Sequence, residues 1–267
     1  ELAAWAGSTN VTTLGTIGTG TWQGTAIATG YIAADAITGA KIADDAVGAE
    51  HIASGLKLVT TDAQNNTVVG TNAGDSFTGT SATGNTLIGK DSGTAITTGD
   101  FNTGVGRSSL LTNTTGYSNT GIGVNALYYN TTGFQNVALG TSTLEANTTA
   151  SYNTAVGYHG LILNTTGQYN VALGSYSLDA NTTGGYNVGL GSFALSSNTT
   201  GANNTAVGYN SLFANTTANE NTAIGFASLD ANTIGTRNVA VGNNALTANT
   251  TASDNTAIGT ATLQANT

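Results

Sequence analysis

Carboxylates and histidines are the first residues to consider for catalysis or metal binding. The most compact group of them comprises Asp44, Asp45, Glu50 and His51. Their spacing matches no metal-ligand pattern, so we favour a solvated acidic face. The other histidine, His159, lies in a different segment and is expected to be an exposed surface residue. The sequence therefore predicts no metal, no cofactor and no catalytic residues, and we expect a protein that is not an enzyme.

Aromatic side chains are better candidates for a binding surface. The candidate glycan contacts are Tyr117, Phe134, Tyr152, Tyr169 and Tyr186. Aromatic rings on a rigid surface can stack on sugar rings while their polar tips form hydrogen bonds. The alternative, which we favour, is that the rings stack on one another and stiffen the protein. Further aromatic residues are Phe101, Tyr128, Tyr129, Tyr158, Tyr176, Phe193, Tyr209, Phe213 and Phe226.

A repeat of 17 residues would position these side chains. Each copy begins with asparagine, and eleven such asparagines follow at a constant interval from Asn85 to Asn255, while Asn66 opens a looser copy. Short strands and turn residues at a fixed period, without helical periodicity, predict an all-β fold, a repetitive β-solenoid or β-roll. At ~4.8 Å per turn, the eleven turns would span ~53 Å.

The near-invariant positions of the repeat, counted from its first asparagine, define its expected core. Position 5 is always Gly, which indicates positive φ or a close backbone neighbour. Position 4 is Val, Ile or Leu and position 9 is nearly always Leu, and we expect both to face inward. Position 12 is Asn within Asn-Thr-Thr, which is typical of a turn and could form amide ladders. The structural residues include Gly106, Gly123, Gly140, Gly157, Gly174, Leu127, Leu144, Leu178, Asn130, Asn147 and Asn181.

Two other features of the repeat could indicate chemistry. Position 10 holds Glu145, Asp179 and Asp230, which are at least two turns apart and too sparse for paired-carboxylate catalysis. Eight Asn-Thr-Thr sequons would accept glycans in a eukaryotic secreted chain, but we favour the turn interpretation. They begin at Asn113, Asn130, Asn147, Asn164, Asn181, Asn198, Asn215 and Asn249.

The thin apolar core of each turn argues for partner chains. Position 3 is Ala or Gly in ten of the eleven copies, the exception being Leu87, and position 2 is only Thr or Val. A strand that is small or apolar on both faces is expected to be buried on both. We therefore predict that the small residue meets an equivalent strand of another chain, and that three chains form a parallel homotrimer.

The N-terminal part follows a different pattern. Its apolar residues recur every five positions, at Ile32, Ile37, Ile42, Val47 and Ile52. Because five is neither a helical nor a strand period, we expect residues 1–62 to form an intertwined fibrous segment. Residues 63–84 would be a transition, and residues 85–267 the β-roll. A short helix over residues 33–53 is the competing interpretation.

Composition excludes several classes of protein. The chain has no cysteine, and therefore no disulfide or thiolate metal site. It has no apolar run of about 18 residues, so no membrane insertion is expected. A net charge of −9 disfavours nucleic acid as a partner. Because the chain opens on Glu1 and stops within a repeat, we expect an internal piece of a longer protein.

Repeat units such as Asn153-Thr-Ala-Val-Gly157 and Asn221-Thr-Ala-Ile-Gly225 resemble the Asn-Ser-Val-Ala-Ile-Gly repeats of trimeric autotransporter adhesin heads. They are still more similar to the Asn-Thr-Ala-Val-Gly…Ser-Leu…Asn-Thr-Thr-Gly arrays in tail fibres of bacteriophages, notably marine ones. The adhesin resemblance implies a left-handed parallel β-roll trimer. The resemblance covers about residues 66–267, and residues 10–27 also resemble phage tail-fibre sequence.

These observations lead to one main hypothesis and two alternatives. The main one is a non-enzymatic structural segment of a phage tail fibre, extracellular on the virion, that attaches to the host surface. Its partners would be two further copies of itself and a host polysaccharide or protein receptor. The first alternative is an adhesin head on a bacterial cell surface. The second is an ice-binding β-solenoid, suggested by the regular Asn/Thr array.

Overall fold

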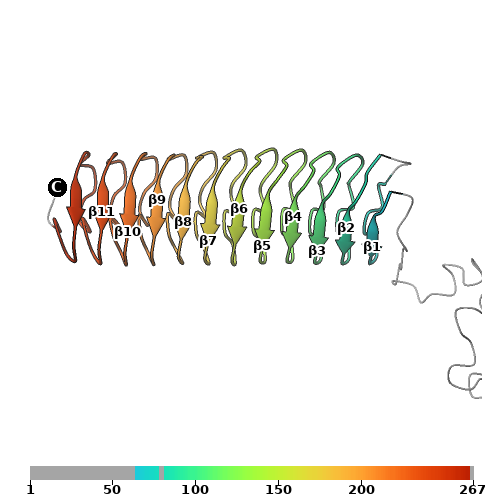
Figure 1. Ribbon diagram of the computed structural model, residues 1–267, viewed down its shortest axis with the longest axis horizontal. Helices are drawn as coiled ribbons and strands as arrows, with labels where there is room; N and C mark the ends of the chain where they lie inside the picture. Colours follow the sequence, from blue (N-terminus) through green and yellow to red (C-terminus); the bar gives the residue numbers. More distant parts are fainter. Residues whose placement is uncertain (1–63, 78–80, 265–267) are drawn as a thin grey trace, which may run out of the picture. The chain divides into compact units, whose positions relative to one another are not determined.

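The computed structural model describes residues 64–77 and 81–264, which form an all-β parallel β-solenoid (Figure 1). Within these residues each coil contributes one strand, and the strands pair in chain order into a single 12-stranded sheet. The predicted solenoid with 17-residue turns is thereby confirmed. The predicted fibrous segment, residues 1–62, and the acidic cluster within it lie outside the described residues.

Each strand covers positions 2 to 4 of its repeat. The strands are β1 (Thr67–Val69), β2 (Thr86–Ile88), β3 (Thr103–Val105), β4 (Thr120–Ile122), β5 (Val137–Leu139), β6 (Thr154–Val156), β7 (Val171–Leu173), β8 (Val188–Leu190), β9 (Thr205–Val207), β10 (Thr222–Ile224), β11 (Val239–Val241) and β12 (Thr256–Ile258). The looser copy opened by Asn66 also forms a coil, because β1 pairs with β2 in the same parallel register as the others.

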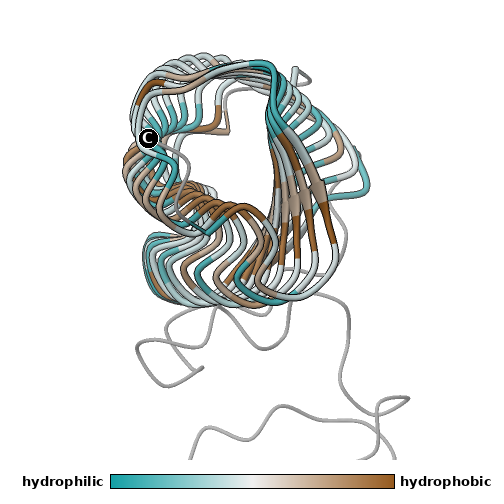
Figure 2. Cartoon of the chain, turned by 90° about the vertical axis from the view of Figure 1, so that its left-hand side faces the viewer, coloured by the Kyte–Doolittle hydropathy of each residue, from teal (hydrophilic) through white to brown (hydrophobic). Residues whose placement is uncertain are grey.

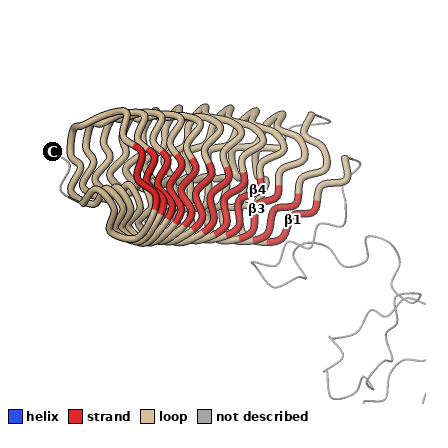
Figure 3. The backbone as a smooth tube through the Cα atoms, turned by 60° about the vertical axis from the view of Figure 1, so that its left-hand side comes forward, coloured by secondary structure: helices blue, strands red, loops and turns tan. Residues whose placement is uncertain are grey.

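Neighbouring coils are stacked in register throughout. Thr154 pairs with Val171 and Ala155 with Ala172, so equal repeat positions form columns along the solenoid. Figure 2 looks along these columns, and Figure 3 shows that the strands occupy only one side of each coil. The other sides are hydrogen-bonded between coils as well; the Leu110 amide, for example, donates to the Ala126 carbonyl at 3.0 Å. Each coil therefore depends on its neighbours along most of its backbone.

Glycine at position 5 is required for both of the predicted reasons. Its φ lies between 123° and 137° in the described coils, a range that L-residues rarely adopt. In addition, a Cβ on Gly157 would lie 2.6 Å from the carbonyl oxygen of Gly174 in the next coil. Conformation and close approach thus act together at this position.

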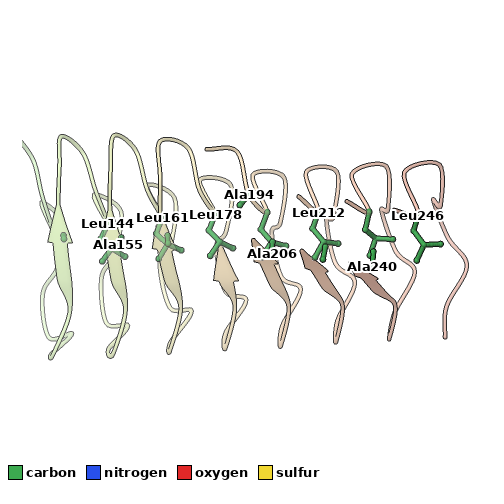
Figure 4. Packing of buried hydrophobic residues seen from close by; sticks show 14 of the residues in the cluster. Leu144, Ala155, Leu161, Leu178, Ala194, Ala206, Leu212, Ala240 and Leu246 are labelled. Carbon is green, nitrogen blue, oxygen red and sulfur yellow. The ribbon is translucent and has the colours of Figure 1, made fainter. Parts of the chain in front are cut away.

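Leucine at position 9 faces inward, as predicted, and fills the core. The leucines of this column from Leu110 to Leu246 are completely buried, and they lie beside the small residues of position 3 (Figure 4). Each of them has φ between 51° and 55°, a left-handed conformation that costs roughly 1–2 kcal/mol. Burial of a leucine contributes roughly 1.5–3 kcal/mol. Leucine burial alone therefore leaves only a small net gain per coil.

The prediction that position 4 faces inward is wrong. In β5, Ala138 is buried, whereas Val137 and Leu139 are 38% and 44% exposed. Successive strand residues point to opposite faces, so only one of positions 3 and 4 can face the core. The interior beside the leucine column holds the smaller one. Position 3 is consequently small because of the core of its own chain, and it does not face a strand of another chain.

The first two coils exchange the sizes of positions 3 and 9. Position 9 is Gly74 or Gly93, and position 3 carries the larger Val68 or Leu87. A Cβ on Gly93 would lie 2.7 Å from the Leu87 methyl groups, so glycine makes room for that side chain. The two exceptions to the repeat therefore compensate each other within one coil.

Candidate functional site

The five predicted aromatic residues come together along one edge of the coils, in what we call the first aromatic ladder. Tyr117 stacks on Phe134, with ring centroids 4.7 Å apart and planes 5° from parallel. Phe134 contacts Tyr152 edge-on at 5.2 Å. Tyr152 stacks on Tyr169 at 4.8 Å, and Tyr169 stacks on Tyr186 at 4.9 Å.

Most ring faces of the first aromatic ladder are covered by neighbouring rings. A sugar stacks on the face of a ring, and this ladder leaves chiefly edges, hydroxyl groups and the outer faces of its terminal rings. Tyr186, one of the terminal rings, is 60% exposed. This geometry favours the structural alternative for the ladder, and glycan contact by its members stays a prediction.

A second aromatic group, the second aromatic cluster, lies at positions 6, 7 and 10 of five successive coils. It consists of Tyr158, His159, Tyr176, Phe193, Tyr209, Phe213 and Phe226. Near-parallel and edge-on contacts alternate along it, so it is not a uniform stack. Its residues change column from coil to coil, and for this reason the repeat pattern does not reveal them as one group.

His159 belongs to this cluster and is partly buried, which differs from its predicted exposure. Its ring stacks on Tyr158 with a centroid separation of 3.8 Å and meets Tyr176 edge-on at 5.4 Å. The difference arises from its neighbours, because Tyr158 precedes it in the chain and Tyr176 follows in the same column one coil later. In this arrangement the imidazole packs between aromatic rings.

The carboxylates of position 10 have unequal surroundings. Asp179 accepts a hydrogen bond from the Ser196 hydroxyl at 2.6 Å, and burial raises the pKa of its carboxyl group against the opposing effect of that bond. Burial also raises the pKa of Asp230, whose Oδ1 is buried and has no hydrogen-bond partner. The two carboxylates are three coils apart in the sequence, so they form no catalytic pair.

The sequon asparagines are buried and form a ladder of amide groups. All eight have no exposed surface. The side-chain amide of Asn130 donates to Oδ1 of Asn113 at 2.6 Å and to the Gly133 carbonyl at 2.9 Å, and the pattern repeats to Asn249. These amides are therefore inaccessible to glycosylation in the folded protein, which supports the turn interpretation.

A second amide ladder is formed by the asparagines of position 1, which the sequence did not indicate. The Asn102 backbone amide donates to Oδ1 of Asn85 at 2.8 Å, and its side-chain amide donates to the Gly116 carbonyl at 2.9 Å. Asn113 donates to that same carbonyl at 2.8 Å. Both ladders thus donate to the carbonyl of position 15, and together they form a polar part of the core.

The outward face of the sheet, which we call the strand face, consists of positions 2 and 4; position 2 is Thr in eight of the 12 strands and Val in the other four. Position 4 carries Val, Ile or Leu in all 12 strands. The most exposed residues of this face are Ile88, Ile122, Val137, Leu139, Val171, Leu173, Ile224 and Ile258. A continuous apolar column of this kind is more than the scattered surface hydrophobics of an ordinary monomer.

Threonines form two further columns with different surroundings. At position 13 the hydroxyl bonds to the next coil, as where Thr114 Oγ1 donates to the Thr131 carbonyl at 3.0 Å. At position 14 the side chains, such as Thr166 and Thr183, are exposed, and their hydroxyls make no hydrogen bond within the described part of the chain. A column of free hydroxyl groups, interrupted at Ile234, therefore runs along the solenoid.

Within residues 64–77 and 81–264, no group of three or more His, Cys, Asp or Glu side chains is placed to hold a metal ion. Among the same described residues, no helix has the length and apolar character needed to cross a membrane. Comparison of the chain with protein-family models, with curated proteins and with solved structures finds no match to any of them.

Proposed function

We propose that the chain is a non-enzymatic structural segment of a phage tail fibre, in which three parallel copies pack through the strand face and the fibre attaches to the host surface. The observation that carries the trimer is the apolar strand face. Threonine would meet the conformational preference of a strand equally well, yet position 4 is never Thr. An apolar residue in every strand is explained if another copy covers it.

The dimensions of the strand face suit such an interface. Eleven coil spacings of ~4.8 Å make it ~53 Å long, and two residue spacings of ~3.3 Å make it ~7 Å wide. The footprint of roughly 370 Å² combines the apolar column of position 4 with the Thr and Val side chains of position 2. A cyclic trimer would cover this face in each copy.

The trimer is tested by changing the strand face without changing the coil. In the full chain, Leu139, Leu173 and Ile224 are replaced together by Thr, a β-branched residue that suits a strand. We expect light scattering to give a trimeric mass for the parent chain, and we expect the triple variant to dissociate at a lower urea concentration than the parent chain, with unchanged circular dichroism in buffer. The control is Ile234→Thr, because Ile234 is 55% exposed within the position 14 threonine column.

Two outcomes would contradict a trimer packed through the strand face: a monomeric parent chain, or a triple variant that dissociates at the same urea concentration as the parent chain. The choice between phage and bacterial surface needs a separate measurement. Immunogold labelling with an antibody against the solenoid should mark tail fibres on virions. Labelling of a bacterial cell surface instead would support the adhesin alternative.

Ice binding is a second candidate because position 14 offers a regular column of free threonine hydroxyls. Thermal hysteresis measured on the full chain tests it directly. If ice binding occurs, replacing Thr166 and Thr183 by Lys should abolish the hysteresis, since both side chains are exposed in the centre of the column. A parent chain that shows no hysteresis would exclude this candidate.

A further inference from the structure

The side of each coil that carries the strand is bounded by two corners, one before the strand and one after it. The corner before the strand is position 17, where the backbone is left-handed in the described coils, with φ of 63° at Tyr152. The corner after the strand is the glycine of position 5, with φ of 131° at Gly157, and positions 6 and 7 follow it. We propose that the first corner of each copy in the trimer packs against the second corner of the next copy through aromatic rings at equal height. The proposal rests on the trimer proposed above and deepens it by naming contacts between its chains.

A closed threefold ring brings these two corners together. The contact in such a ring is heterologous, so the surface before the strand of one copy meets the surface after the strand of the next. Between the corners, from Asn153 to Gly157, an extended chain covers four spacings of ~3.3 Å, or ~13 Å. Three sides of this length around one axis place each strand ~4 Å from the axis. The centre then has room only for the side chains of the strand face, and the corners of neighbouring copies meet.

The symmetry of the ring also fixes which residues meet. Copies related by a closed rotation are not shifted along the axis, so residues of equal height face one another. Tyr152 and Tyr158 lie six residues apart in a coil of 17 residues, so their heights differ by only ~2 Å at ~4.8 Å per coil. The residue before a given strand therefore faces the residue after the same strand in the next copy.

At three neighbouring strands, β6, β7 and β8, both corners carry aromatic rings. The rings before these strands belong to the first aromatic ladder and are Tyr152, Tyr169 and Tyr186. The rings after the same strands belong to the second aromatic cluster and are Tyr158, Tyr176 and Phe193. Because the first aromatic ladder presents chiefly ring edges, the contact between copies would be edge-on, which is a favoured geometry for aromatic pairs.

The corners of β3 add an ionic contact at a fourth height. Position 17 also carries a ring before this strand, Phe101, and it is preceded by Asp100. The residue after β3 is Arg107, which is exposed and forms no ion pair within the described part of the chain. Asp100 uses Oδ1 to accept hydrogen bonds from the Thr83 amide and hydroxyl, at 2.8 and 3.1 Å. Arginine both pairs with carboxylates and stacks on aromatic rings, so Arg107 of one copy complements Asp100 and Phe101 of the next.

The test is dityrosine cross-linking of the full chain with a photo-excited ruthenium complex and persulfate, which joins tyrosine rings that touch. All samples carry Tyr31→Phe, because Tyr31 lies outside the described residues. We expect covalent dimers and trimers on a denaturing gel. Replacing Tyr152, Tyr169 and Tyr186 together by Phe keeps the rings and the trimer but should abolish these covalent species. The control replaces Tyr128 and Tyr129 by Phe, at positions 10 and 11 away from both corners, and should leave the cross-linking unchanged.

The outcomes separate this contact from the trimer itself. The proposal is overturned if the parent is trimeric by light scattering but gives no covalent species, or if the triple Phe variant cross-links as well as the parent. In either case the trimer packed through the strand face would stand. A parent that is monomeric by light scattering would overturn both.

The ionic contact at β3 is tested by reversing a charge. Arg107→Glu should make the trimer dissociate at a lower urea concentration than Lys90→Glu does. Lys90 is the matched control because it occupies the same column one coil earlier, where the opposite corner carries the uncharged Thr83 and Gly84. Equal effects of the two substitutions would contradict the proposed arrangement of the corners.

Discussion

Two glycines of one coil, Gly157 and Gly160, allow a sharp test of how the coils are stacked. Gly157 occupies position 5 with φ of 131°, and a Cβ there would lie 2.6 and 2.7 Å from the oxygen and carbon of the Gly174 carbonyl. Gly160 occupies position 8, and its added Cβ would lie 3.7 Å from the Cβ of Ala155, an ordinary contact. We predict opposite effects for alanine at these two positions.

The magnitudes follow from strain and contact distance. For Gly157→Ala, the unfavourable φ and the clash with backbone atoms, which cannot move without separating the coils, together cost about 3–5 kcal/mol. Gly160→Ala removes backbone freedom from the unfolded chain without strain and should stabilise the protein by about 0.4–1 kcal/mol. Other coils support the second value, because Ala126, Ala194 and Ala245 occupy position 8 and are buried.

The assay is urea unfolding of the full chain followed by circular dichroism, with the free energy of unfolding compared between the two variants. Because the strained glycine is central, we also expect Gly157→Ala to divide the solenoid and split the transition into two. Equal effects of the two substitutions, or a Gly157→Ala variant as stable as the parent, would refute the stacking argument.

Three further predictions concern the core and its charges. Leu178→Ala should cost about 2–5 kcal/mol in thermal unfolding, against less than about 0.5 kcal/mol for the half-exposed control Leu163→Ala. Asn181→Ala should cost about 1–3 kcal/mol for each buried partner left unpaired, one of which is Oδ1 of Asn164, and Asn181→Gln should not restore stability. Asp230→Asn should stabilise the protein at neutral pH but not near about pH 3. Burial raises the pKa of the Asp230 carboxyl above its ordinary value of 3.8 in the folded protein. The parent chain therefore loses stability as the pH rises from the unfolded pKa through the folded pKa, because the carboxyl must ionise in the folded protein. Melting temperatures at both pH values check this, and an equal gain at both would contradict it.

Much of the fold is predictable because the constant spacing of the repeat restricts the architecture. The period of 17 residues, the invariant Gly and the inward Leu follow directly from the sequence. The sequence does not show which face of the strand points inward. Ala155 and Val156 are both acceptable core residues, and alternation alone does not decide which of the two faces the core. The deciding factor is the narrow interior beside Leu161, which is a property of the assembled coil.

The aromatic groups are predictable only where their residues recur at the same repeat position. Tyr152, Tyr169 and Tyr186 share one position in successive repeats, so in-register stacking places them together. The second aromatic cluster is not evident from the sequence as one group, because its rings come from several repeat positions. The unpaired oxygen of Asp230 depends on which atoms surround it, and repeat spacing carries no information on that.

The two amide ladders also restrict how the length of this protein can change. An insertion between Asn147 and Asn153, or between their equivalents in the other coils, would shift one column against the other and leave buried amides unpaired. Gain or loss of a complete 17-residue unit preserves the contacts that the near-invariant positions make between neighbouring coils. Recombination between equivalent positions of two repeats can therefore lengthen or shorten the solenoid in steps of ~4.8 Å and keep the same core packing.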